Sequence, residues 1–118
     1  MRRVVITGMG IVSPLGAGLK HNWDSLLNAQ SGIDRITGFE VSDLACQIAG
    51  QVPQDQRAGA LNMDNFIEPK EQRKLDRFIQ LGIVAGAEAV EDSGWKPKDI
   101  AGQDRSGVMM GSGIGGLQ

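Results

Sequence analysis

Three glycines near the end of the chain have a spacing that could do chemistry. Gly111, Gly113 and Gly116 fit the pattern G-x-G-x-x-G and follow the apolar run "SGVMM". In a dinucleotide site such glycines follow a strand, a helix receives the pyrophosphate, and an acidic residue comes ~20 positions later. Two residues follow Gly116 here, and the earlier phrase "GMGIVS" has Ser13 at its sixth position. The pattern therefore favours a structural or substrate-lining glycine turn over a site for NAD or FAD.

Two further reactive side chains each occur once, Cys46 and His21. A nucleophilic cysteine needs a pKa lowered by a helix N-terminus or a cationic neighbour. Cys46 lies instead in an alternating, strand-like stretch, so we expect a buried and inert thiol. His21 has no second histidine and no Cys/His cluster with which to bind a metal, so we expect a solvated surface residue. The sequence predicts no catalytic residue and no metal ligand.

Four basic residues form the remaining pattern. Lys70, Arg73, Lys74 and Arg77 have the spacing i, i+3, i+4, i+7, which predicts one stripe along a helix. Like charges at this spacing repel by a few tenths of a kcal/mol per pair, and the macrodipole disfavours cations near a helix N-terminus. A solvated helix face is one interpretation. The other is an anionic partner, either an acidic protein surface or a phosphate.

The first half of the chain supplies the elements around these residues. The β-branched run at residues 4–6 predicts a buried strand of a parallel sheet. A helix is expected from Leu19, with Gly32 as a stop signal shortly beyond it. "LACQIAGQV" alternates with a period of two and ends at Pro53, which predicts a strand with one wet face. Residues 53–68 are expected to be irregular. The apolar face of the expected helix consists of Leu19, Trp23, Leu26 and Leu27.

The second half carries the strongest helix pattern. Pro69 suits a first helical position, and Gly94 lies just past the expected end. "LGIVAGA" is apolar on all sides, so this part of the helix is expected to be buried. "RSGVMMGSG" predicts a final strand entering a glycine turn. The order β, α, β, α, β indicates an α/β layer fold, with too few elements to enclose that helix, so we expect a piece of a larger domain. Small residues that permit close packing on the helix are Gly82, Ala85, Gly86 and Ala89.

Composition narrows the class of protein. The chain has 118 residues, a net charge of −2, 41% hydrophobic residues and one cysteine. It therefore has no general attraction to nucleic acid or to anionic membranes. No stretch approaches the ~20 apolar residues of a membrane span. A cytoplasmic protein without membrane insertion is expected.

Taken together, four phrases resemble the chain-elongating β-ketoacyl-acyl-carrier-protein synthases of bacterial fatty-acid synthesis. They are "RRVVITGMGIVSPLG", "W..LL.AQSGI", "RKLDRFIQLGIVAGAEAVEDSGW" and "GVMMGSGIGGL". The resemblance implies an α/β, thiolase-like fold with αβαβα layers. Residues 1–118 would be the N-terminal part of such a domain, within its first βαβαβ half, and the remainder of the domain would be missing.

The resemblance also implies an activity for the complete protein. Members of the family are acyltransferases of lipid metabolism that add two carbons to an acyl chain by decarboxylative Claisen condensation. A cysteine takes the acyl group, and two histidines assist the decarboxylation of malonyl-carrier. These three residues lie beyond the segment matched here, so the chain alone is expected to be inactive. No metal or organic cofactor is implied, since the substrates travel on the phosphopantetheine of acyl carrier protein, and a homodimer is expected.

Five site residues follow from the resemblance. The "GSGIGG" turn places Gly113 and Ile114 at the acyl pocket, with Ile114 as its gate. "KEQRK" places Lys70, Arg73 and Lys74 against the acidic surface of acyl carrier protein. Two alternatives stay open, namely a non-catalytic partner subunit resembling a chain-length factor and a truncated dinucleotide-binding domain.

Overall fold

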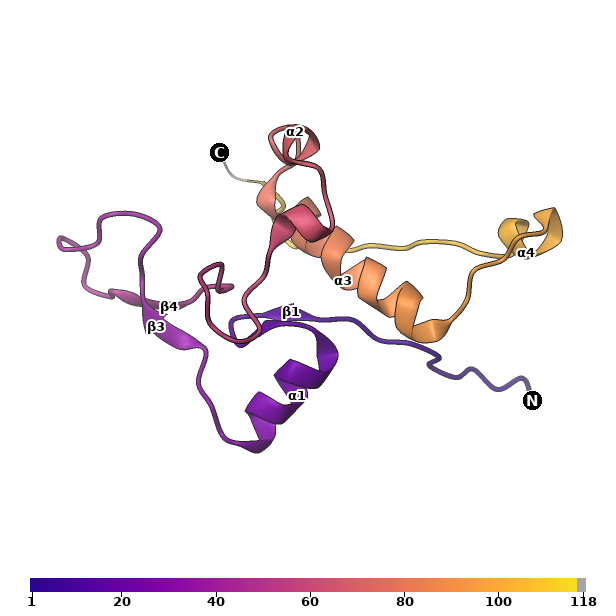
Figure 1. Ribbon diagram of the computed structural model, residues 1–118, viewed down its shortest axis with the longest axis horizontal. Helices are drawn as coiled ribbons and strands as arrows, with labels where there is room; N and C mark the ends of the chain where they lie inside the picture. Colours follow the sequence, from indigo (N-terminus) through magenta and orange to yellow (C-terminus); the bar gives the residue numbers. More distant parts are fainter. Residues whose placement is uncertain (117–118) are drawn as a thin grey trace. The chain divides into compact units, whose positions relative to one another are not determined.

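A computed structural model describes residues 1–116 of the chain. They divide into two compact units, unit 1 with Met1–Gly10 and the residues from Met63 onward, and unit 2 with Ile11–Asn62. Each unit is described by itself. The elements are β1 (Val12–Ser13), β2 (Gly16–Ala17), α1 (Leu19–Leu27), β3 (Ile33–Arg35), β4 (Ile48–Gly50), the 3-10 helix η1 (Met63–Asn65), α2 (Pro69–Gln72), α3 (Arg77–Ser93) and α4 (Ile100–Asp104). Figure 1 labels them except for β2 and η1.

Unit 2 is organised around one buried amide, the side chain of Asn22 in α1. Its Nδ2 donates to the carbonyl oxygens of Gly16 at 3.0 Å and Gly18 at 2.9 Å, and its Oδ1 accepts the hydroxyl of Ser13. Asn22 is 2% exposed. Since β1 and β2 are only two residues long each, these hydrogen bonds fix the hairpin on the helix that follows it.

Replacement of Asn22 by leucine is expected to destabilise the protein by about 3 kcal/mol. The change leaves the buried carbonyl of Gly16 and the hydroxyl of Ser13 without the Asn22 amide, and each unsatisfied group costs about 1–3 kcal/mol. The carbonyl of Gly18 loses one of its two donors and keeps the backbone N–H of residue 22. The matched control is Asn28→Leu at the exposed end of the same helix, which loses one exposed hydrogen bond and is expected to cost under about 1 kcal/mol. Denaturant unfolding of the complete protein measures both, and equal losses would contradict the buried role.

The predicted strand at residues 44–52 is present but short. β4 pairs antiparallel with β3, with Ile33 opposite Gly50 and Arg35 opposite Ile48. The predicted helix at Leu19 is confirmed as α1, but its apolar face is not covered by the described residues. Trp23 is 60% exposed, whereas the buried residues of α1 are polar. The inward face of this helix therefore forms hydrogen bonds with the hairpin rather than an apolar core.

In unit 1 the predicted helix over residues 69–93 is interrupted. α2 ends at Gln72 and α3 begins at Arg77, while both predicted end signals are confirmed, with Pro69 in the first turn and Gly94 left-handed at φ 63°. The side-chain amides of Gln72 and Gln80, hereafter the glutamine clamp, hold the chain at this interruption. Gln80 Nε2 lies 2.8 Å from the carbonyl oxygens of Gln72 and Leu75.

The small-residue face of α3 packs closely, as the sequence predicts. A Cβ added at Gly10 would lie 2.0 Å from the carbonyl oxygen of Ala85, and one at Gly8 would lie 2.4 Å from that of Ala89. The backbone of the first ten residues therefore runs directly against the helix. Here glycine is required by space, since any side chain would meet backbone atoms.

Three other expectations are wrong for the described residues. Residues 4–6 and 105–113 form no strand, and the two sheets among the described residues are two-stranded and antiparallel, so no parallel sheet forms there. Val4 is 97% exposed and Met109 also 97%. The apolar part of α3 buries Val84 but leaves Ile83 40% exposed. A strand needs a partner strand, and none of the described residues supplies one to these segments.

Candidate functional site

The basic residues lie on three consecutive pieces of backbone. Lys70 lies in α2, Arg73 caps it, Lys74 follows in the turn, and Arg77 begins α3. The predicted single helical stripe is therefore wrong, because the chain leaves the helix between Gln72 and Arg77. We call residues 70–77 the basic segment. All four cations are exposed.

The charges of the basic segment differ in their partners. Lys74 Nζ lies 2.7 Å from Glu71 Oε1, an exposed pair that stabilises little. With other described residues, neither Lys70 nor Arg73 forms an ion pair. Partial burial lowers the pKa of the Arg77 guanidinium, which still leaves it protonated at neutral pH. Within the basic segment, Lys70 and Arg73 thus carry positive charge with no ion-pair partner among the described residues.

The glycines near the end of the chain make an exposed turn, hereafter the closing turn, residues 111–116. The chain bends at Gly113 and Ile114, and Ile114 is 80% exposed. Gly115 has φ +81°, which a residue with a side chain adopts at a cost of about 1–2 kcal/mol. Leu117, the end of the phrase "GVMMGSGIGGL", lies outside the described residues.

The closing turn and the basic segment meet at the start of α3. A Cβ built at Gly115 would lie 3.5 Å from Phe78 Cζ, and one at Gly116 would lie 2.0 Å from Asp76 Oδ2. Asp76 is the residue that precedes α3, and its side chain makes no capping hydrogen bond. Two groups of residues some 40 positions apart, singled out separately from the sequence, are therefore neighbours in unit 1.

The expectations for Cys46 and His21 are wrong. Cys46 is exposed and lies just before β4, where its Sγ donates to the carbonyl of Ile48 at 3.4 Å. His21 is half-buried, with Nε2 3.0 Å from the carbonyl oxygen of Leu15. Its ring lies against Gly59, where an added Cβ would be 2.1 Å from the ring. His21 therefore packs the turn of unit 2, and neither side chain has a nucleophile's or ligand's surroundings.

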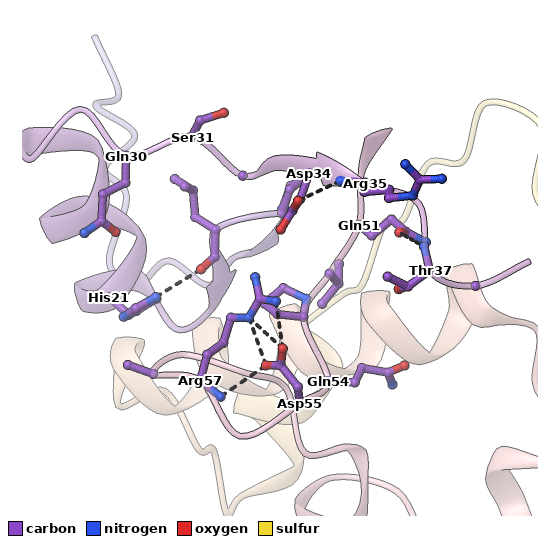
Figure 2. A pocket seen from close by; sticks show the side chains of 17 residues that line it. His21, Gln30, Ser31, Asp34, Arg35, Thr37, Gln51, Gln54, Asp55 and Arg57 are labelled. Carbon is purple, nitrogen blue, oxygen red and sulfur yellow. Dashed lines mark hydrogen bonds and ion pairs between the residues drawn. The ribbon is translucent and has the colours of Figure 1, made fainter. Parts of the chain in front are cut away.

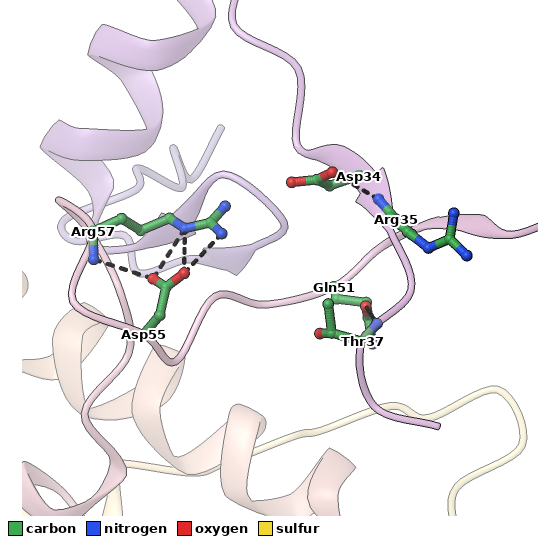
Figure 3. A network of polar contacts seen from close by, with 6 residues as sticks. All are labelled: Asp34, Arg35, Thr37, Gln51, Asp55 and Arg57. Atoms are coloured by element: carbon green, nitrogen blue, oxygen red, sulfur yellow. Dashed lines mark hydrogen bonds and ion pairs between the residues drawn. The ribbon is translucent and has the colours of Figure 1, made fainter. Parts of the chain in front are cut away.

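Unit 2 also contains a polar hollow of about 570 Å³ (Figure 2). Asp55 and Arg57 lie at one side of it, with Arg57 Nε 2.8 Å from Asp55 Oδ2 and Nη2 2.7 Å from the same oxygen (Figure 3). Hydrogen bonds from Arg57 lower the pKa of the Asp55 carboxyl. Across the hollow Gln51 Oε1 accepts the backbone N–H of Thr37 at 3.0 Å. The Asp55 carboxylate is thus held by Arg57, and the Gln51 amide by the backbone of Thr37.

Metal chemistry finds no support in the described part of the chain. Residues 1–116 contain no group of three or more His, Cys, Asp or Glu that is arranged to hold a metal ion. In the same residues no helix has both the length and the apolar character needed to cross a membrane. The features with chemical content are thus the basic segment and the closing turn.

Comparison with known proteins decides the family. Residues 1–118 match the family described as "Beta-ketoacyl synthase, N-terminal domain". The chain belongs to the β-ketoacyl synthase family. Among curated β-ketoacyl synthases, the 3-oxoacyl-[acyl-carrier-protein] synthase 2 of Rhizobium meliloti is 49% identical over 119 residues, which are 100% of this chain and 28% of that protein.

Other members give the same result. The 3-oxoacyl-[acyl-carrier-protein] synthase 2 of Vibrio cholerae is 42% identical over 99% of this chain and 27% of its own length. A solved structure, the ishigamide ketosynthase/chain length factor, matches with a TM-score of 0.68 and 28% identity over 80% of this chain and 22% of that one. The β-ketoacyl synthase fold is thus shown by sequence and by structure. The chain spans under a third of the length of these relatives.

Proposed function

We propose that the protein of which this chain is the N-terminal part is a β-ketoacyl-acyl-carrier-protein synthase, a transferase of fatty-acid synthesis. The observation that carries the proposal is the 49% identity to a 3-oxoacyl-[acyl-carrier-protein] synthase 2 over the whole chain. The complete domain would have the layered αβαβα thiolase arrangement. Within it, the extended runs at residues 4–6 and 107–110 would gain the strand partners that residues 1–116 do not provide.

The proposed reaction balances without a redox or metal step. An enzyme cysteine outside this chain would hold the acyl group as a thioester. Malonyl-carrier would lose CO₂, its α-carbon would form the new C–C bond to the acyl carbonyl, and the cysteine would leave as a thiolate. Two histidines, also outside this chain, would stabilise the developing negative charge. We further propose a cytoplasmic homodimer that needs no metal or organic cofactor of its own.

This chain would supply binding rather than bond-making groups. Lys70, Arg73 and Lys74 would contact the acidic surface of acyl carrier protein. Lys70 and Arg73 have no ion-pair partner among the described residues, and such charge attracts an anionic partner most strongly at low salt. Gly113 and Ile114 would line the acyl chain beside the reacting thioester. The contact between the closing turn and the start of α3 supports this assignment, because a carrier-borne acyl group has to reach both.

The direct test is a condensation assay with the complete protein. Octanoyl-carrier and malonyl-carrier are expected to give 3-oxodecanoyl-carrier and one equivalent of CO₂. Mass spectrometry of the carrier measures the 3-oxodecanoyl product. Absence of condensation and of acyl transfer to the protein would overturn the proposal. Titration with NAD and FAD tests the dinucleotide alternative, which predicts saturable binding.

Ile114→Phe is expected to shorten the acyl chains that the enzyme accepts. The larger ring would occupy space beside the closing turn, and one or two methylenes of misfit reduce kcat/KM by about tenfold or more. We expect that loss for octanoyl-carrier and little change for acetyl-carrier. The matched control is Ile100→Phe in α4, where the side chain is 76% exposed. Equal kcat/KM values for both acyl groups in the Ile114 variant would contradict the gate assignment.

A second function has one observation in its favour. The name of the structural relative, a ketosynthase/chain length factor, includes a chain length factor, which is the kind of subunit that this alternative proposes. The protein would then keep the fold, the carrier contacts and the pocket but lack the nucleophile. Incubation of the complete protein with acyl-carrier separates the two, because a synthase becomes acylated on cysteine and a chain-length factor does not.

A further inference from the structure

The basic segment is held in place by two glutamine side chains. Gln80, half-buried in the first turn of α3, donates from Nε2 to the carbonyl oxygens of Gln72 and Leu75, at 2.8 Å each. Gln72 in turn donates from its own Nε2 to Asp64 Oδ1 and to the carbonyl oxygen of Ile67, at 2.7 Å each. Side-chain amides therefore link η1, α2 and α3 within unit 1.

The backbone between the two helices depends on this clamp. α2 has four residues, and so short a helix has no stability of its own in water. The last carbonyls of a helix lack intrahelical partners. Here the carbonyl of Gln72 accepts the Gln80 amide at 2.8 Å as well as the Leu75 N–H at 3.3 Å, and the carbonyl of Leu75 accepts the Gln80 amide at 2.8 Å. Arg73 and Lys74 lie between these two carbonyls. The same turn is closed by the Lys74 N–H on the Glu71 carbonyl at 2.9 Å. The Gln80 amide therefore adds two hydrogen bonds to the backbone turn that sets the direction of both cations.

We propose that Gln80 is a positioning residue for the binding of acyl carrier protein. The inference rests on the proposed function, since it acts through Arg73 and Lys74. A binding surface that is ordered in advance avoids the entropic cost of ordering on association. Without the Gln80 amide, the Leu75 carbonyl would lose this partner and the Gln72 carbonyl would keep only the longer hydrogen bond from the Leu75 N–H. The basic segment would then be less ordered and would have to be ordered by each arriving carrier. Binding would weaken, whereas the reaction of an acyl group already in place would not change.

The test compares two forms of one substrate with the complete protein. In Gln80→Met, which keeps the length of the side chain and removes its donors, KM for octanoyl-carrier is expected to rise about tenfold. The kcat for that substrate is expected to stay within about twofold, and kcat/KM for octanoyl-pantetheine, which has no carrier protein, is expected to be unchanged. Hydrogen exchange of the amides of residues 72–76 should become faster.

Gln103→Met in α4 is the matched control, because its amide donates to Pro97 at 3.4 Å and lies outside the basic segment. This variant is expected to leave both substrates unaffected. A merely structural role of Gln80 would lower kcat/KM for octanoyl-carrier and octanoyl-pantetheine equally, and that result overturns the inference. An unchanged KM for octanoyl-carrier in the Gln80→Met variant would also overturn the inference.

A triple variant distinguishes the inference from the proposed function. If Gln80 acts through the cations, adding Gln80→Met to Arg73→Glu and Lys74→Glu is expected to raise KM by less than the product of the separate effects. Fully multiplicative effects would overturn the positioning role while leaving the carrier assignment intact. If Arg73→Glu and Lys74→Glu leave KM unchanged, the carrier assignment itself is wrong and the inference falls with it.

Discussion

Lys70→Glu with Arg73→Glu is expected to weaken the binding of acyl carrier protein to the complete enzyme by about 100-fold at low salt. Both side chains are exposed, and neither forms an ion pair with another described residue. Their reversal therefore replaces attraction to an acidic partner by repulsion without breaking an internal contact. Surface plasmon resonance or fluorescence titration with the carrier measures the change.

The salt dependence makes this prediction specific. The Debye length is about 10 Å at 0.1 M salt and about 3 Å at 1 M, so the difference between the variant and the wild type should shrink as salt is added. The wild-type affinity falls with salt, while that of the variant stays flat or rises. Lys96→Glu with Lys98→Glu, which makes the same change of net charge at exposed positions elsewhere in unit 1, should retain wild-type affinity. An equal loss in both double variants would indicate a general charge effect and would defeat the assignment of the basic segment.

Gly10→Ala is expected to destabilise the complete protein by about 3 kcal/mol, near the upper end of the usual cost of overpacking. The added Cβ would lie 2.0 Å from the carbonyl oxygen of Ala85 and 2.7 Å from the backbone nitrogen of Ala89. Neither atom can move without distorting a turn of α3. Residues 8–10 would therefore have to move away from the surface of α3. Unfolding in guanidinium chloride, followed by circular dichroism, measures the loss.

Gly86→Ala on the same helix is the matched control for Gly10→Ala. A Cβ at Gly86 meets no described atom within 4 Å, and alanine in a helix interior stabilises by roughly 0.5–1 kcal/mol relative to glycine. Stability equal to or above that of the wild type is therefore expected. If Gly10→Ala is as stable as the wild type, the close approach of the first ten residues to α3 is wrong.

The helices could be predicted from the sequence because their signals are local. Pro69 and Gly94 mark the ends of the second helical region through φ preferences that hold in any surroundings. The interruption was missed, although Asp76 carries a signal for it, since aspartate is favoured where a helix begins. The regular spacing of the basic residues outweighed that signal in the sequence-based interpretation.

The strands could not be predicted in the same way, because a strand is completed by its neighbour. Residues 4–6 have a strong β-branched pattern and yet pair with nothing among the described residues. Hydrophobicity also failed to predict the inward face of α1, where the buried residues are the polar Asn22 and Ser25 rather than Trp23. Which face of α1 is buried depends on the carbonyls of the adjacent hairpin that need a hydrogen-bond donor. That need arises from tertiary structure and cannot be read from the helix sequence.

For the candidate site, the sequence predicts residues but not their arrangement. The resemblance placed the basic segment and the closing turn in one enzyme, and the contacts of Gly115 and Gly116 with the start of α3 show that they adjoin. No sequence rule indicated the glutamine clamp, because a side chain that bonds to the backbone eight residues earlier leaves no periodic pattern. Such contacts become visible only when the break in the helix is known.

The division of the chain has a consequence for the order of events during synthesis. Unit 2 is continuous in sequence, whereas unit 1 needs the first ten residues and α3 together. On a ribosome adding about 5–20 residues per second, unit 2 is complete several seconds before α3 has emerged. Residues 1–10 therefore lack their packing partner until α3, which begins more than sixty residues later in the chain, has been synthesised. During that interval their apolar side chains are accessible to chaperones.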